Sequence, residues 1–350
     1  MGEDLTRRPT ILDVARRAGV SRAAVSRVIR DAYGVSAEMR AKVEAAVAEL
    51  GYRPLVAARG LRSQTYTIGL AIPNHHNTLR DTFFNRVVDG ILSSLAGTRY
   101  NLIVAPSDAT PGSERTAIEA LADRQVDGLV AHASAESLGR LEELNAYVPV
   151  VGLGVHSAAG YDTLVGDDRF GAGLAVRHLY DLGHRSIYHL TSVNGPHFSD
   201  TPHRLRVVGY QETMRDLGLE HRAAVHAIDE ADQSANQIGD SAHSVARRLL
   251  EQAAAPIAIF AGNDALALAV LRAMAELGLA ADQVSVVGYD DTDVAAYPLI
   301  DLTSVDQDGH RMGVTAVRLL LERIGGRRDG VRETITPHLT ARASSRPPRR

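Results

Sequence analysis

The sequence predicts a small all-α domain at the N-terminus, followed by a larger α/β core with two lobes. Three capped helical patterns occupy the first fifty residues, and from about Tyr66 onward short β-branched runs alternate with amphipathic helical patterns. This alternation is typical of parallel sheets wound by crossover helices. Roughly ten such runs would overfill a single sheet, so we expect two parallel sheets.

The three N-terminal helices have recognisable start and stop signals. Thr10 followed by Asp13 is typical of a capping box, and Gly19 is placed to end the first helix. Ser21 is expected to cap the second helix and Ser36 the third. A helix, a tight turn containing glycine and a second helix are typical of a helix-turn-helix motif.

The second helix is expected to have one polar, basic face and one apolar face. At about 100° per residue, the polar face collects positions 22, 23, 26, 27 and 30, and the apolar face collects positions 24, 25, 28 and 29. A surface helix of any enzyme can show the same division. The tight turn, and a polar face made only of small residues and arginines, favour insertion into a DNA major groove about 12 Å wide.

The charge is distributed asymmetrically along the chain. Residues 1–63 carry 12 Arg and Lys against seven Asp and Glu, whereas the remainder carries 26 against 35, giving a net charge of −4 overall. A basic end is where a phosphate backbone would bind, although a solvated basic terminus has the same composition. No apolar run reaches the roughly 18 residues of a membrane span. The start MGEDLTRRPT lacks a secretory signal, so we expect a cytoplasmic protein with no membrane partner.

The sequence offers no convincing catalytic, cofactor or metal motif. The absence of cysteine excludes disulfides, thiol catalysis and cysteine zinc sites. Adjacent His75 and His76 have poor geometry for a shared metal, and the aspartates near 290 lack the other ligands of a calcium loop. No phosphate-binding loop or nucleophile elbow is present. We therefore expect no enzyme activity, no cofactor and no metal.

Several segments carry a family resemblance. TILDVARRAGVSRAAVSRVI, VSAEMRAKVEAAVAELGYRP and AARGLRS resemble the headpiece of the LacI/GalR family of transcriptional regulators, the lactose and galactose repressor type. The resemblance continues through TIGLAIP, HLYDLGHRSI, RVVGY, FAGNDALALAVLRAMAELGL and VSVVGYDD. Ala24 stands where the family usually has a threonine, and Leu55 where it often has the asparagine that starts the hinge.

The resemblance implies a helix-turn-helix headpiece at 1–53, a hinge at 54–64 and a periplasmic-binding-protein-like core at 65–342. Lobe 1 is expected to contain residues 65–165 and 291–321, and lobe 2 residues 166–290 and 322–342. The chain would then cross between lobes near Gly166, Asp290 and Glu322. We expect the tail, residues 343–350, to be disordered.

The resemblance also implies a set of DNA-binding residues: Thr10, Ser21, Arg22, Ala23, Ser26, Arg27, Arg30, Arg59 and Leu61. Arg22 is our candidate for reading a guanine edge, whereas Ser26 and Arg27 are expected to hold phosphates. The hinge is too short to be a stable isolated helix, so DNA and a partner chain should order it. Leu61 would then wedge into the minor groove, although a plain linker with one buried leucine is the alternative.

For the effector, the resemblance places a pocket arginine at Arg206. Asn263 and Asp290 follow apolar runs at strand ends, so both should point into the cleft between the lobes. The expected effector-binding residues are Asn74, Asp81, Phe84, Arg206, Asn263 and Asp290. Phe84 would stack on the apolar face of the ligand. The alternative is an ion pair of Arg206 with Asp290 that only braces lobe 2.

The sequence therefore predicts a DNA-binding transcriptional regulator, a repressor controlled by a small carbohydrate-like effector. Two headpieces on a homodimer should bind a palindromic double-stranded operator. We expect dimers only, because the tail RASSRPPRR lacks the apolar heptad helix of family tetramers. A nucleoside or purine effector is the alternative within this architecture. A solute-binding receptor and an enzyme acting on a sugar are the alternatives from other classes.

Overall fold

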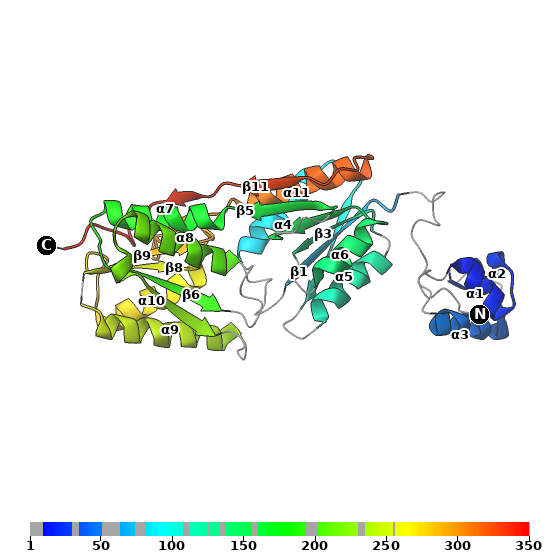
Figure 1. Ribbon diagram of the computed structural model, residues 1–350, viewed down its shortest axis with the longest axis horizontal. Coiled ribbons are helices and arrows are strands. Elements are labelled where there is room, and N and C mark those ends of the chain that lie inside the picture. The colour runs from blue at the N-terminus through cyan, green and yellow to red at the C-terminus, as the bar shows by residue number, and fades with distance from the viewer. Residues whose placement is uncertain are drawn as a thin grey trace. The chain divides into compact units, whose positions relative to one another are not determined.

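The computed structural model describes residues 10–29, 35–50, 64–73, 82–107, 112–124, 126–132, 137–155, 160–193, 202–229, 235–254 and 256–349. The chain divides into two compact units, Met1–Gln64 and Thr65–Arg350, which are described in turn (Figure 1). The predicted boundary between headpiece and hinge, after residue 53, lies outside the described residues.

The first unit is a three-helix domain, as predicted. Its helices are α1 (Ile11–Ala18), α2 (Arg22–Ile29) and α3 (Ala37–Leu50). Their apolar faces form one small core, and Val14, Val25 and Val43 are fully buried at its centre.

The predicted caps of these helices are confirmed. The Thr10 hydroxyl accepts from the amide of Asp13 at 3.4 Å, and the Asp13 carboxylate accepts from the amide of Thr10 at 2.8 Å. Gly19 ends α1 in the left-handed region, with φ 67°. The hydroxyls of Ser21 and Ser36 accept from backbone amides three residues further on, at 3.1 and 3.2 Å. Local capping chemistry therefore fixes where each helix begins.

The second unit contains two six-stranded sheets, which confirms the predicted fold class. The order of the first is β11 (Arg332–Ile335), β5 (Asp162–Gly166), β4 (Val150–Leu153), β3 (Gly128–His132), β1 (Thr67–Pro73) and β2 (Asn101–Ser107). The order of the second is β12 (His338–Thr340), β10 (Thr303–Asp306), β9 (Val284–Tyr289), β8 (Ile257–Ala261), β6 (Ile187–Val193) and β7 (Ala224–Asp229). The pairing of β10 with β12 is antiparallel and the other described pairings are parallel.

Each sheet is the middle of three layers (Figure 1). In lobe 1, α4 (Thr82–Leu95) and α11 (Gly309–Ile324) cover one face, and α5 (Ser113–Asp123) and α6 (Leu138–Asn145) cover the other. In lobe 2, α7 (Asp168–Asp181) and α8 (Pro202–Asp216) cover one face, and α9 (Ala235–Gln252) and α10 (Asp264–Leu277) cover the other; a short 3₁₀ helix, Glu220–Arg222, follows α8. The inner strands β3, β4, β8 and β9 are buried along all or nearly all of their length, which explains their continuous apolar runs.

Two helix pairs pack closely because glycine lies where they meet. A Cβ on Gly90 of α4 would overlap the carbonyl oxygen of His310, and one on Gly313 of α11 would overlap that of Val87. A Cβ on Gly209 of α8 would likewise overlap the carbonyl oxygen of Arg169 at the start of α7. Within the described residues, no helix is long and apolar enough to cross a membrane.

Two of the three predicted crossings between the lobes are wrong. The first lies at Asp167, next to the predicted Gly166. The second lies at 307–308 rather than at Asp290, because β10 pairs with β9 and keeps residues 291–306 in lobe 2. The third lies at 336–337 rather than at Glu322, because β11 pairs with β5 and belongs to lobe 1. The short strands β10 and β11 are defined by their pairing with β9 and β5. Their own sequences carry no strong signal that would predict a strand.

The predicted disorder of the tail is also wrong for residues 343–349, which pack against lobe 2. The hydroxyl of Ser344 donates to the carbonyl of Val286 at 2.7 Å, and the amide of Val286 donates to the carbonyl of Ser344 at 2.8 Å. His184 Nε2 lies 2.9 Å from the carbonyl oxygen of Arg346. Serine hydroxyls and backbone groups, which composition alone ignores, therefore hold this segment in place.

Candidate functional site

The candidate DNA-binding face lies on α2. Ser21, Arg22, Ala23 and Arg27 are exposed and Ser26 is half-buried. On the opposite face, Ala24, Val25 and Val28 are at most 5% exposed and contribute to the core of the first unit. The departure from the family at Ala24 therefore affects the core of the headpiece and leaves the exposed face unchanged.

The remaining residues predicted to bind DNA have other surroundings. Thr10 is half-buried, and its hydroxyl lies 2.6 Å from the carboxylate of Asp13, so the cap already uses it. Arg30, Arg59 and Leu61 lie outside the described residues, and their roles stay predictions.

The candidate effector site is centred on Arg206, which lies on α8 and is 4% exposed. Its Nε donates to Asp168 Oδ1 at 2.8 Å, and its Nη1 donates to the carbonyl of Gly262 at 2.5 Å. Its Nη2 is 3.8 Å from Asp290 Oδ1, and its Cζ lies 3.8 Å from the centre of the Tyr289 ring. Gly262 follows β8 and Asp290 follows β9, so these contacts lie at the carboxyl edge of the second sheet, where ligands of parallel sheets bind.

The charge of Arg206 is stabilised by its carboxylate neighbours. Burial alone lowers the pKa of Arg206, but Asp168 and Asp290 outweigh it, so the pKa lies above its ordinary value. Asp290 has a φ of 99°, an unusual backbone conformation for a residue with a side chain. Its amide donates to the carbonyl of Val305 at 2.8 Å, and its Oδ1 accepts from Gln307 Nε2 at 2.5 Å. The second crossing segment, which contains Gln307, is thus bonded directly to this site.

The other predicted effector residues either have a structural role as well or lie outside the described residues. Asn263 is half-buried beside Gly262, and its Oδ1 caps α10 by accepting from the amide of Leu266 at 2.9 Å. Phe84 is 8% exposed and contributes to the core of lobe 1, with edge contacts to Phe83 and His132. Asn74 and Asp81 lie outside the described residues. The structure therefore brings Arg206 and Asp290 together, with Asn263 beside them.

The sequence analysis missed three residues of this region. Asp168 is the nearest carboxylate to Arg206, and its position just after β5 was the available signal. His203 Nδ1 is 3.3 Å from the hydroxyl of Thr191, and burial and Arg206 lower the pKa of His203 to about 3. Burial raises the pKa of Asp264 to about 6, although Ser304 and Thr292 donate to its carboxylate. His203 and Asp264 could not be identified from the sequence, because only the fold shows which groups surround them.

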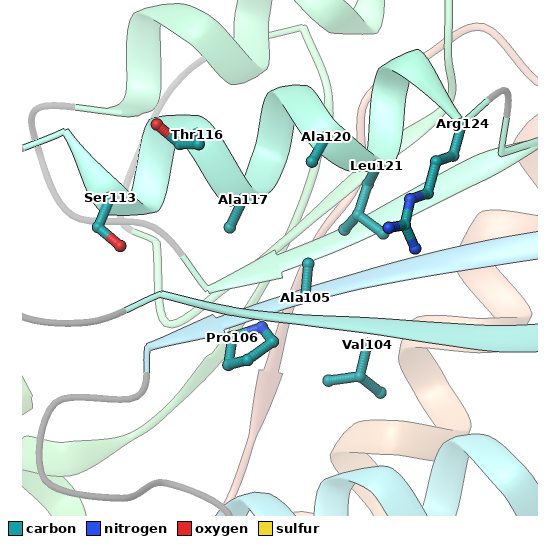
Figure 2. Close-up of a pocket in the computed structure, with 9 residues that line it drawn as sticks. All are labelled: Val104, Ala105, Pro106, Ser113, Thr116, Ala117, Ala120, Leu121 and Arg124. Carbon is teal, nitrogen blue, oxygen red and sulfur yellow. The ribbon is translucent and has the colours of Figure 1, made fainter.

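A separate pocket of about 330 Å³ lies between α5 and β2 in lobe 1 (Figure 2). Its lining residues are Val104, Ala105, Pro106, Ser113, Thr116, Ala117, Ala120, Leu121 and Arg124. Figure 2 shows Arg124 at one end and Ser113 at the other, with Thr116 and apolar side chains between them. None of the described effector residues, Phe84, Arg206, Asn263 and Asp290, lines it, so it is distinct from the candidate site at Arg206.

Both units match known protein families. Residues 10–54 match bacterial regulatory proteins of the lacI family, and residues 176–345 match the periplasmic binding protein-like domain. The ribose operon repressor of Escherichia coli K12 is 33% identical over 320 residues, covering 90% of this chain and 93% of the relative. The transcriptional repressor PurR of Vibrio campbellii is 32% identical over 322 residues, covering 90% and 92%.

Solved structures are similar along nearly the whole chain. The lac repressor dimer bound to operator and an anti-inducer has a TM-score of 0.67 and 28% identity, covering 97% of this chain and all of that one. The regulator CelR in complex with cellobiose has a TM-score of 0.66 and 30% identity, covering 96% and 100%.

An exposed basic helix in a helix-turn-helix unit and a two-sheet, periplasmic-binding-protein-like core define a DNA-binding transcriptional regulator. The matches over both units make the assignment more specific. The chain belongs to the LacI family of bacterial regulatory proteins.

Proposed function

We propose that this protein is a repressor that binds a palindromic operator as a homodimer and responds to a small carbohydrate-like effector held between its lobes. The observation that carries the proposal is the buried Arg206 beside Asp290 at the carboxyl edge of the second sheet, in a chain whose α2 exposes Arg22 and Arg27. Such a protein acts in the cytoplasm, where the DNA is, and needs no catalytic turnover.

The chemistry of the second lobe supports a hydroxyl-rich effector. Arg206 supplies N–H donors, Asp290 supplies acceptors, and the amide of Asn263 can supply a donor while its oxygen caps α10. Phe84 contributes little ring surface because it is 8% exposed, which favours a sugar over a nucleobase that needs a stacking partner. Relatives include a ribose operon repressor and a regulator solved with cellobiose.

For DNA, we propose that Arg22 reads a base edge and that Ser21, Ala23, Ser26 and Arg27 complete the face that enters the major groove. Thr10 contributes from the N-terminus of α1. Arg30, Arg59 and Leu61 extend this set. Effector binding would change the arrangement of the lobes, so operator affinity and effector affinity are linked reciprocally.

Fluorescence anisotropy with the full chain tests this proposal. A palindromic operator selected from random duplexes should bind with high affinity, and one of D-ribose, cellobiose or hypoxanthine should change that affinity. Arg206→Lys keeps a positive charge in the site but loses the planar fork of donors, so it should abolish the effector response while effector-free DNA affinity is retained. Circular dichroism melting checks that the variant is folded.

Selection that yields no preferred duplex would refute the regulator proposal. A normal effector response in a folded Arg206→Lys variant would refute the assignment of the clamp. A response to hypoxanthine alone would favour the purine alternative.

A further inference from the structure

The guanidinium of Arg206 is already compensated by two carboxylates. Asp168, 4% exposed, accepts from Nε at 2.8 Å, and Asp290 lies 3.8 Å from Nη2. Nη1 donates to the carbonyl of Gly262, and the Tyr289 ring covers one face of the guanidinium at 3.8 Å. One cation and two anions therefore make up the core of the site.

The ionisable groups considered next, all within the described residues, add no excess positive charge around Arg206. Arg86 is matched by Asp306 at 3.3 Å, and Arg342 by Asp291 at 2.5 Å. The two histidines near Arg206, at 189 and 203, stay neutral because burial lowers their pKa values to about 4 and about 3. Among these described groups of both lobes, the charge around Arg206 is therefore negative on balance.

We infer that the group of the effector that meets Arg206 is uncharged, and that Asp168 and Asp290 make this site reject phosphate and carboxylate groups. This inference rests on the proposed function of the site. Nε and Nη1 of Arg206 already donate to Asp168 and Gly262, so a phosphate could not take a two-pronged set of donors from it, and its charge would be repelled by both carboxylates. A hydroxyl can donate to Asp290 and accept from Nη2, so free sugars are selected over sugar phosphates.

Asp290 is the carboxylate of this site that can best be changed to test the selectivity against anions. Its side chain is 14% exposed and its distance to Arg206 is longer than that of Asp168. Asp290→Asn removes one negative charge with almost no change in shape, and its Oδ1 can still accept from Gln307 Nε2. The variant leaves Arg206 paired with Asp168 alone, which gives an anion access to the remaining donors.

Isothermal titration calorimetry of the full chain with inorganic phosphate, at constant ionic strength, tests the inference. The wild type should show no binding below about 10 mM, and Asp290→Asn should bind phosphate at least tenfold more tightly. The matched control is Asp293→Asn, which removes the same charge from an exposed position three residues further on and should behave as the wild type. Adding Arg206→Lys to Asp290→Asn should remove the gain.

Two results would overturn the inference. One is submillimolar phosphate binding by the wild type that Arg206→Lys abolishes, a result that does not depend on whether Asp290→Asn folds. The other is a folded Asp290→Asn chain with no gain. Operator binding, measured on the same preparations, is independent of phosphate. A chain that binds no operator would refute the proposed function alone. The phosphate titrations would still report on the charge balance of the site.

Discussion

His189 lies in the middle of the second sheet, on β6, and is fully buried. Its ring stacks on Phe260 and Tyr210, with centroids 4.5 and 5.3 Å apart. Nδ1 lies 2.9 Å from the carbonyl oxygen of Phe260, and because a carbonyl can only accept, Nδ1 carries the hydrogen. The pKa of His189 is lowered from 6.5 to about 4, mainly by burial; the bond to Phe260 acts against this shift and the charge of Arg206 adds to it.

Acid should therefore destabilise the second lobe through His189. In the unfolded chain the ring takes up a proton near pH 6.5, but in the folded chain only near pH 4. Its contribution to stability is present above pH 6.5 and is lost as the pH falls toward 4. Linkage between these two pKa values gives a loss of about 2.5 kcal/mol between pH 7 and pH 4.5.

His189→Phe removes this titration and keeps an aromatic ring in the stack. At pH 7 the variant should be less stable by about 1 kcal/mol, because it loses the bond to Phe260. At pH 4.5 it should be the more stable protein, because the stability difference shifts in its favour by about 2.5 kcal/mol. Urea unfolding at a series of pH values measures both quantities.

His221→Asn, which changes an exposed histidine, serves as the control and should follow the wild type at every pH. If the wild type and His189→Phe lose equal stability on acidification, His189 is not the acid-sensitive group and the reasoning from burial is wrong.

Three further predictions concern DNA, packing and assembly. Arg22→Ala should weaken operator binding by about 1–3 kcal/mol and relax the base preference at one position of each half-site; a uniform loss on all duplexes would instead make Arg22 a phosphate contact. Gly313→Ala places a methyl group against the carbonyl of Val87 and should lower the free energy of unfolding by about 1–3 kcal/mol in urea, whereas Gly139→Ala, with open space around it, should not. Leu299, 98% exposed on lobe 2, is expected in the dimer contact; Leu299→Asp should shift sedimentation equilibrium toward monomer, and an unchanged dimer would contradict that placement.

The headpiece could be predicted in detail because its signals are local. The hydroxyls of Thr10, Ser21 and Ser36 each act within three residues of their own position, so their spacing alone identifies the helix starts. The long apolar strands of the core were predictable for a similar reason. Short strands such as Thr303–Asp306 could not be predicted in this way, because they are defined by pairing with a strand elsewhere in the chain.

In the candidate site, too, the residues within local motifs could be predicted and the long-range contacts could not. Arg206 and Asp290 could be named from the motifs that contain them. The contact between Arg206 and Asp168 joins positions 38 residues apart, and it depends on the close approach of α7 and α8 at Gly209. Ser344 is bonded to Val286, 58 residues earlier, so no property of the tail itself predicts its order.

The two late crossings also determine when each lobe can be completed during synthesis. Lobe 1 obtains α11 and its edge strand β11 only after the whole of lobe 2 up to Asp306 has been made, and β12 follows still later. At about 5–20 residues per second, the ribosome needs roughly 8–30 seconds to proceed from the end of β5 to the end of α11. During that interval the part of the sheet that α11 will cover, and the side of α4 that packs against α11, lack this partner. The headpiece can fold early, whereas the core must wait, so chaperones should engage lobe 1 before the protein can respond to any effector.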